Sequence, residues 1–68
     1  MADSVFKKIQ LVGTSTKSFS DAAANAIAKA ARNEANLSWF EVVEERGSIA
    51  GGQIQQYQVT VNIGIKVE

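Results

Sequence analysis

The chain has 68 residues, of which 46% are hydrophobic. This length is enough for one domain but lies close to the lower limit for a self-sufficient core. It contains no cysteine and no histidine, which excludes disulfides, thiolate metal sites and the common histidine-dependent nucleophiles. Seven basic and seven acidic residues leave a net charge of zero, without the basic stripe that binding to a nucleic-acid backbone requires. Since chains this short usually need a disulfide, a metal or a partner subunit, we expect a homo-oligomer.

The sequence contains no signal for a membrane or for a second domain. No apolar run approaches the length of a membrane span, and MADSVFKK at the start lacks the apolar stretch of a signal peptide. No repeat, low-complexity segment or linker interrupts the chain, so residues 1–68 are predicted to form one domain. We expect a cytoplasmic protein with no membrane partner and no nucleic-acid partner.

The first predicted element is a strand over residues 5–15, VFKKIQLVGTS, which ends in a Gly-Thr-Ser turn. Val5, Ile9 and Leu11 have the same parity in this strand. We therefore expect these three side chains to face the core, with Lys7 near the edge.

A helix is predicted next, over residues 19–36. Ser18, followed three positions later by Asp21, resembles a capping box at its start. Alanine dominates the segment, which favours a helix and lets it lie close to a sheet. One apolar face repeats at spacings of three, four and seven residues, as is typical of a buried face: Phe19, Ala23, Ala26, Ile27, Ala30 and Leu37.

Two more strands are predicted, at residues 39–47 and 53–68, with residues 48–52 as the connection of a hairpin. Alternation assigns Phe40 and Val42 to the side that faces the helix. The last strand contributes its odd-numbered residues to that side: Tyr57, Val59, Val61, Ile63, Ile65 and Val67. The predicted fold is α+β, in the order strand, helix, strand, strand.

Trp39 has the opposite parity, so its indole is predicted on the sheet face that a single helix leaves uncovered, together with Gln58. The residue type alone favours an anchor at a subunit interface, and the alternative is a stacking platform for a planar ligand. A glutamine amide offers an acceptor and two donors in one plane, which suits the edge of a heterocycle. Taken alone, Gln58 is also typical of a solvated strand.

Other charged residues are expected to be solvated. Arg46 and Lys66 are each either a surface charge or a contact for an anionic ligand group. Glu44 has the opposite parity from Glu41 and Glu45, so we expect no catalytic pair of carboxylates among them. No metal ligand is assigned.

Several short motifs now resemble one known family. V-G-T-S at 12–15, W-F-E-V at 39–42 before R-G at 46–47, and Y-Q-V at 57–59 resemble the dodecins in order and spacing over essentially the whole chain. The resemblance implies a three-stranded antiparallel sheet wrapped around one helix, with twelve subunits in a hollow homododecamer. It also implies that paired flavins stack between symmetry-related tryptophans, with Trp39 as the stacking residue and Gln58 at the pyrimidine edge of the ring.

The same resemblance implies further ligand contacts. Arg46 matches an arginine associated with flavin mononucleotide (FMN), and Lys66 occupies a position that is commonly arginine in bacterial dodecins. Lysine keeps the charge but loses the bidentate fork of arginine. Lys29 matches a basic helix position and is the candidate for contact with coenzyme A. FMN, riboflavin or FAD is the expected cofactor.

The function implied by the resemblance is storage and sequestration of flavin, with quenching of its photochemistry, rather than catalysis. A flavin oxidoreductase is a second hypothesis, against which stand the absence of histidine and cysteine and the enclosure of the ring on both faces. A third hypothesis is a structural oligomer in which Trp39 holds subunits together without flavin, or a binder of another ligand, including a metal ion at the acidic residues.

Overall fold

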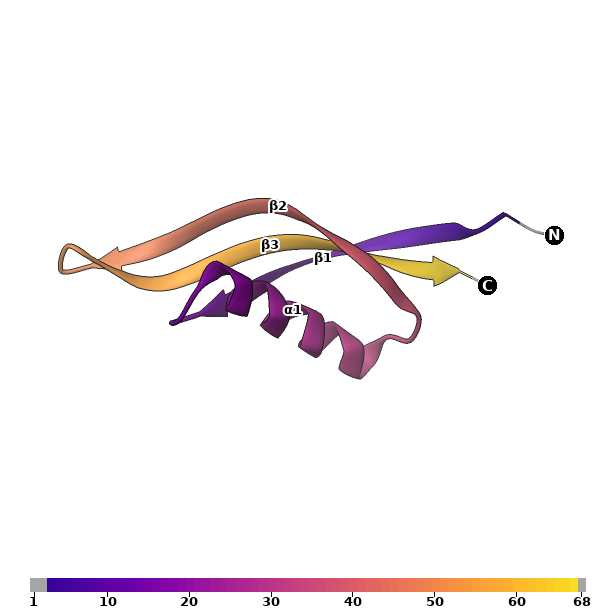
Figure 1. Cartoon of the computed structure of the whole chain (residues 1–68), viewed down its shortest axis with the longest axis horizontal. Coiled ribbons are helices and arrows are strands. Elements are labelled where there is room, and N and C mark those ends of the chain that lie inside the picture. The colour runs from indigo at the N-terminus through magenta and orange to yellow at the C-terminus, as the bar shows by residue number, and fades with distance from the viewer. Residues whose placement is uncertain (1–2, 68) are drawn as a thin grey trace.

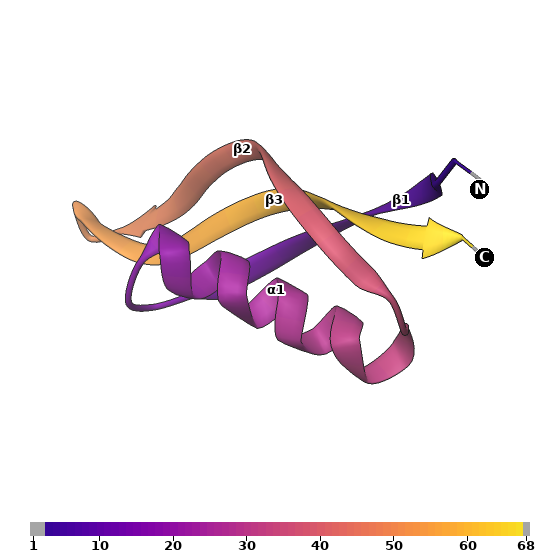
Figure 2. The same cartoon turned by 45° about the vertical axis from the view of Figure 1, so that its right-hand side comes forward.

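The computed structural model describes residues 3–67, in four elements: β1 (Val5–Ser15), α1 (Phe19–Asn33), β2 (Leu37–Ala50) and β3 (Gln53–Val67). The strands form one antiparallel sheet in the order β1-β3-β2, which confirms the predicted α+β order. The helix lies along one face of this sheet (Figure 1 and Figure 2). Within residues 3–67, no helix is long and apolar enough to cross a membrane.

The core forms between α1 and the central strand. Four aliphatic side chains of β3 and three alanines of α1 are buried in one cluster: Ala22, Ala26, Ala30, Val59, Val61, Ile63 and Ile65. Ile9 and Leu11 pack against this cluster as expected, whereas Val5, near the end of the sheet, is 61% exposed. The prediction that Val5 faces the core was therefore wrong.

The helix lies close to β1 because Gly13 has no side chain. A Cβ at this position would collide with the backbone carbonyl of Ala22 and lie 2.8 Å from the Cβ of Ala26. Asn25 joins the same two elements, since its Nδ2 donates to the carbonyl of Thr14 at 2.9 Å. Small side chains on both elements therefore set the spacing between helix and sheet.

The ends of α1 follow local capping rules. Ser18 caps the start, since its Oγ accepts from the backbone N–H of Asp21 at 3.0 Å, as predicted. The helix ends at Asn33, three residues earlier than predicted. Asn36 has φ 66°, a left-handed conformation that asparagine tolerates and that turns the chain towards β2.

The β2–β3 hairpin is longer than the sequence indicated. Strand β2 continues to Ala50, so residues 48–50 belong to the strand and only Gly51 and Gly52 form the turn. Both glycines have positive φ, 59° and 76°, as two-residue hairpin turns require. Figure 1 shows that the hairpin extends well beyond the start of α1.

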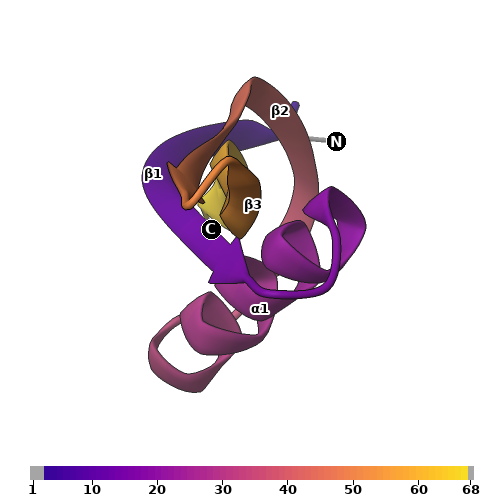
Figure 3. The ribbon, with the colours of Figure 1, turned by 90° about the vertical axis from the view of Figure 1, so that its left-hand side faces the viewer.

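Strand β2 is not covered by the helix, because α1 packs against β1 and β3. Viewed end-on, β1 and β2 curve to either side of β3, with α1 along one face (Figure 3). Phe40 and Val42 lie on the helix side, as predicted from alternation, but they are 49% and 48% exposed because the helix does not reach over β2. An open apolar groove of about 520 Å³ separates them from the α1 residues Ala23 and Ile27.

Candidate functional site

The sheet register places Trp39 and Gln58 on the same face, opposite to α1. Trp39 pairs with Gly64, and Arg46 pairs with Gln58. We call this surface the bare face: it carries the even-numbered residues of β3 from Gln58 to Lys66 and their partners on β1 and β2. Since the odd-numbered residues of β3 fill the core, the shared face expected from alternation is confirmed.

The indole of Trp39 rests on the backbone of Gly64. A Cβ on this glycine would collide with three carbons of the indole, so the ring occupies the space of the missing side chain. Phe6 on β1 flanks it, with ring centroids 5.7 Å apart and planes inclined by 56°. The tryptophan remains 39% exposed, which leaves part of an aromatic surface open for stacking.

The amide of Gln58 is held by two neighbours. Its Oε1 accepts from the Nε of Arg46 at 2.8 Å, and its Nε2 donates to the Oε1 of Gln56 at 2.9 Å. One N–H and one lone pair of the amide are left for a ligand. Among residues 3–67, no carboxylate forms an ion pair with Arg46, so its guanidinium charge is available to an anion.

Two β-bulges decide which β2 residues lie on the bare face. The register shifts between Leu37 and Trp39, and again between Val42 and Glu44, and each shift leaves one β2 residue unpaired. The first separates Leu37, which packs against the core, from Trp39.

The second bulge brings Glu44 and Arg46 to the face of Trp39, where strict alternation would have turned both away. Glu45 instead lines the groove beside α1. The parity assigned to Glu44 and Glu45 from the sequence was therefore wrong.

The predicted ligand contacts fall at two separate ends of the bare face. Trp39 and Lys66 lie at one end, and Gln58 and Arg46 lie at the other. Six residue steps separate Gly64 from Gln58, which is about 20 Å at 3.3 Å per residue. A three-ring heterocycle is shorter than that, so within one chain the same ring cannot touch Trp39 and Gln58. Lys29 lies on the exposed side of α1, across the sheet from both ends.

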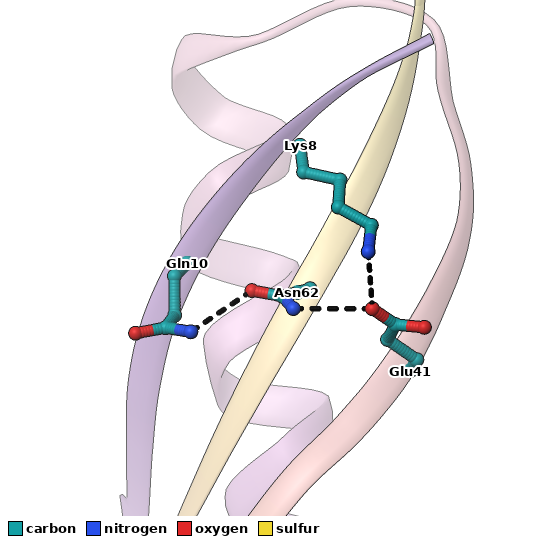
Figure 4. Close-up of polar contacts among 4 residues, drawn as sticks. All are labelled: Lys8, Gln10, Glu41 and Asn62. Atoms are coloured by element: carbon teal, nitrogen blue, oxygen red, sulfur yellow. Dashed lines mark hydrogen bonds and ion pairs between the residues drawn. The ribbon is translucent and has the colours of Figure 1, made fainter.

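A polar network that sequence reasoning missed crosses the sheet between these ends (Figure 4). The Oε2 of Glu41 forms an ion pair with the Nζ of Lys8 at 2.7 Å and accepts a hydrogen bond from the Nδ2 of Asn62 at 3.1 Å. Asn62 in turn accepts from the Nε2 of Gln10 at 3.1 Å. The hydrogen bonds from Lys8 and Asn62, with the charge of Lys8, lower the pKa of Glu41 below its usual range. The sequence gives only the parity of these residues within their own strands. Parity does not show which residues of different strands are neighbours until the register is known.

The described residues offer little to a metal ion. Within residues 3–67, no three acidic side chains lie close enough together to form a cation site. Glu41 is committed to Lys8 and Asn62, and Glu45 is on the other side of the sheet from Glu44.

Comparison with known proteins identifies the family. The dodecin family model matches residues 5–68. The chain belongs to the dodecin family. A dodecin from Thermus thermophilus is 41% identical over 64 residues, which are 94% of this chain and 93% of that protein. The solved dodecin of Streptomyces coelicolor matches with a TM-score of 0.94 and 34% identity, over 100% of this chain and 97% of the other.

A third dodecin is described with a ligand, calcium. The Mycobacterium tuberculosis protein is described as a calcium-chelating antigen, calcium dodecin, with a novel calcium-binding site. It matches with a TM-score of 0.81 and 28% identity, over 94% of this chain and 91% of the other. Dodecins of similar fold thus carry different descriptions, and the side chains of this chain must decide its ligand.

Proposed function

We propose that this dodecin stores and sequesters flavin, with the isoalloxazine ring stacked on Trp39. The observation that carries the proposal is the half-open indole, seated on Gly64 on the sheet face that α1 leaves uncovered. A planar ligand gains both buried area and a stacking contact there, the latter contributing about 0.5–1.5 kcal/mol per aromatic pair. FMN, riboflavin and FAD share this ring.

The pocket is completed by other copies of the chain. Since Trp39 and Gln58 are too far apart to contact one ring, the ring stacked on one copy's Trp39 takes its edge contact from another copy's Gln58. Arg46 and Lys66 are likewise separated, and together they supply positive charge from two copies to the phosphate of FMN.

Exposed apolar surface supports assembly into a homo-oligomer, for which family resemblance implies twelve subunits. Among residues 3–67, ten large hydrophobic side chains are exposed, on both faces and at both ends of the sheet. They are Val5, Phe6, Val12, Trp39, Phe40, Val42, Val43, Ile49, Ile54 and Val67. A single chain of this size that left them in water would be poorly stable and prone to associate.

Sequestration follows from the chemistry of the contact. An indole stacked on a flavin donates an electron to the excited ring, and the return of that electron to the indole leaves both rings in their ground states before the flavin emits light or reacts. Enclosure between copies also leaves no path for a substrate to the reactive part of the ring, and the chain has no histidine or cysteine to act as an acid, base or nucleophile. The proposed role is therefore binding, not catalysis.

Titration of each flavin with the protein tests the proposal. We expect the emission of FMN, riboflavin or FAD to fall and then level off once the protein sites exceed the flavin. Emission that stays undiminished at excess protein contradicts flavin binding against Trp39. Continuous turnover of a reduced nicotinamide cofactor by the complex would instead identify an oxidoreductase.

Mixed oligomers test the contribution of two copies to one pocket. Chains with Trp39→Ala and chains with Gln58→Ala are unfolded together in equal amounts and refolded. If the two residues come from different copies, about a quarter of the pockets regain both side chains, the product of two independent halves. If they came from one chain, no pocket would. We expect the mixture to bind flavin with wild-type affinity at about that fraction of sites, whereas each variant alone does not.

Coenzyme A is a second proposed ligand, with Lys29 as its contact. Because Lys29 lies on α1, across the sheet from Trp39, we propose that coenzyme A and flavin bind without competition. An unchanged flavin titration in the presence of excess coenzyme A is the expected result, and displacement of flavin would contradict the separate site.

A further inference from the structure

We propose that the ion pair of Lys8 and Glu41 is a brace that holds the indole of Trp39 over Gly64. The role of the brace in flavin binding rests on the proposed function, but its effect on the indole does not. Lys8 and Glu41 are positioning residues, since they act through Trp39.

The first argument is the position of the two residues around the indole. Glu41 follows Trp39 by two positions on β2 and lies on the same face. Lys8 is the β1 partner of Gly64, the residue on which the indole rests. Both charged groups are therefore immediate neighbours of the indole along and across the sheet.

The second argument is the path of the lysine side chain. Lys8 is on β1 and Glu41 is on β2, with β3 between them, so the 2.7 Å ion pair requires Lys8 to reach across β3 (Figure 4). Their partners on β3 are Gly64 and Asn62, so the pair crosses beside the seat of the indole. Phe6, which pairs with Lys66, flanks the indole on the side away from the ion pair. The indole is thus confined by Gly64 below, Phe6 on one side and the ion pair on the other.

The third argument is that the pair is restrained on all three strands. Asn62 donates to the same Oε2 of Glu41 and is itself held by Gln10. The side chains of Lys8 and Glu41 are 52% and 48% exposed, and exposed pairs of this kind add little to stability. What the network restricts is geometry: a carboxylate with two donors on one oxygen has few orientations available.

Glu41→Ala, compared with Glu44→Ala, tests the brace. Glu44 lies on the same face, pairs with Thr60 and has no hydrogen bond or ion pair among the described residues. Because Trp39 is the only tryptophan, its near-ultraviolet circular dichroism and emission anisotropy report on the indole without any flavin. Glu41→Ala should weaken the circular dichroism and the anisotropy of Trp39 and lower the affinity for flavin about tenfold. Glu44→Ala should leave all three unchanged.

A pH profile separates the brace from a general effect on folding. Within the described part of the chain, the charged groups on this face are Lys8, Glu41, Glu44, Arg46 and Lys66, and none faces Glu41 from α1, which covers the opposite face. A carboxylate whose pKa is lowered by folding keeps its ion pair above the ordinary pKa and loses it as the pH falls through the lowered value. In the wild type the anisotropy of Trp39 should fall in that acid range, and in Glu41→Gln this step should be absent.

Rescue keeps the test decisive if Glu41→Ala is poorly folded. The exchanged pair, Lys8→Glu with Glu41→Lys, restores the attraction across β3 and should recover the anisotropy that either single variant loses. Equal signals in Glu41→Ala and Glu44→Ala, or no recovery in the exchanged pair, would overturn the brace. A wild type that fails to quench flavin while Glu41→Ala still frees the indole would contradict the proposed function and leave the brace standing.

Discussion

Replacement of Trp39 by alanine is expected to lower the affinity for flavin about 30-fold or more, since loss of a buried aromatic anchor costs 2 kcal/mol or more. Emission from any flavin that still binds should return, because the electron donor is gone. The indole is half-exposed and lies outside the core cluster, so the fold should persist. Parallel titrations of wild type and variant, read by flavin emission, give both quantities.

Trp39→Phe is the matched control for this variant. Phenylalanine keeps an aromatic surface over Gly64 but is a poorer electron donor than indole. We expect its affinity for flavin to fall less than that of Trp39→Ala, with a clear return of emission. If Trp39→Ala bound and quenched flavin as the wild type does, the stacking assignment would be wrong.

Gly64→Ala is expected to lower the affinity for flavin as much as Trp39→Ala does, although the tryptophan itself is not replaced. The new Cβ would collide with the indole, so the ring must move away from residue 64. Because the obstructed group is a half-exposed side chain, it can swing into solvent and the protein should stay folded. Flavin titration and the circular dichroism of Trp39 should both report the displacement.

Gly13→Ala gives the contrasting result for the same chemical change. There the added Cβ meets the backbone carbonyl of Ala22, which cannot move away without shifting α1. We expect the free energy of unfolding to fall by about 1–3 kcal/mol, the usual cost of overpacking.

The double variant Gly64→Ala with Trp39→Ala should bind flavin no more weakly than either single variant, because both remove the same contact. Additive losses would show that Gly64 acts on the ligand by another route.

Alternation in the sequence was sufficient to predict the two faces of β3 and the face on which Trp39 lies. The last strand is central and alternates strictly from Tyr57 to Ile65, so its inward side followed from the chemistry of burial alone. Trp39 and Gln58 were placed together on the uncovered side for the same reason. The side of Phe40 was predicted correctly, but its exposure could not be, since exposure depends on which two strands α1 covers.

The distance between the site residues could not be predicted from parity. Parity assigns a face, whereas position along the face depends on register, which turns and bulges set. Neither Ser38 nor Val43 is a residue type that marks a β-bulge in the sequence. The bulge at Val43 changes the face of the residues after it, so Arg46 could not be assigned to the bare face from the sequence. The network around Glu41 was missed for the same reason, since its partners come from two other strands.

The most direct measurement of the central claim is a crystal structure of the protein saturated with flavin. It should show the isoalloxazine ring parallel to the indole of Trp39 at van der Waals distance, about 3.5–4 Å, with the amide of Gln58 from a different copy at the ring edge. A ring bound away from Trp39, or a bare face that stays empty at saturating flavin, would contradict the account.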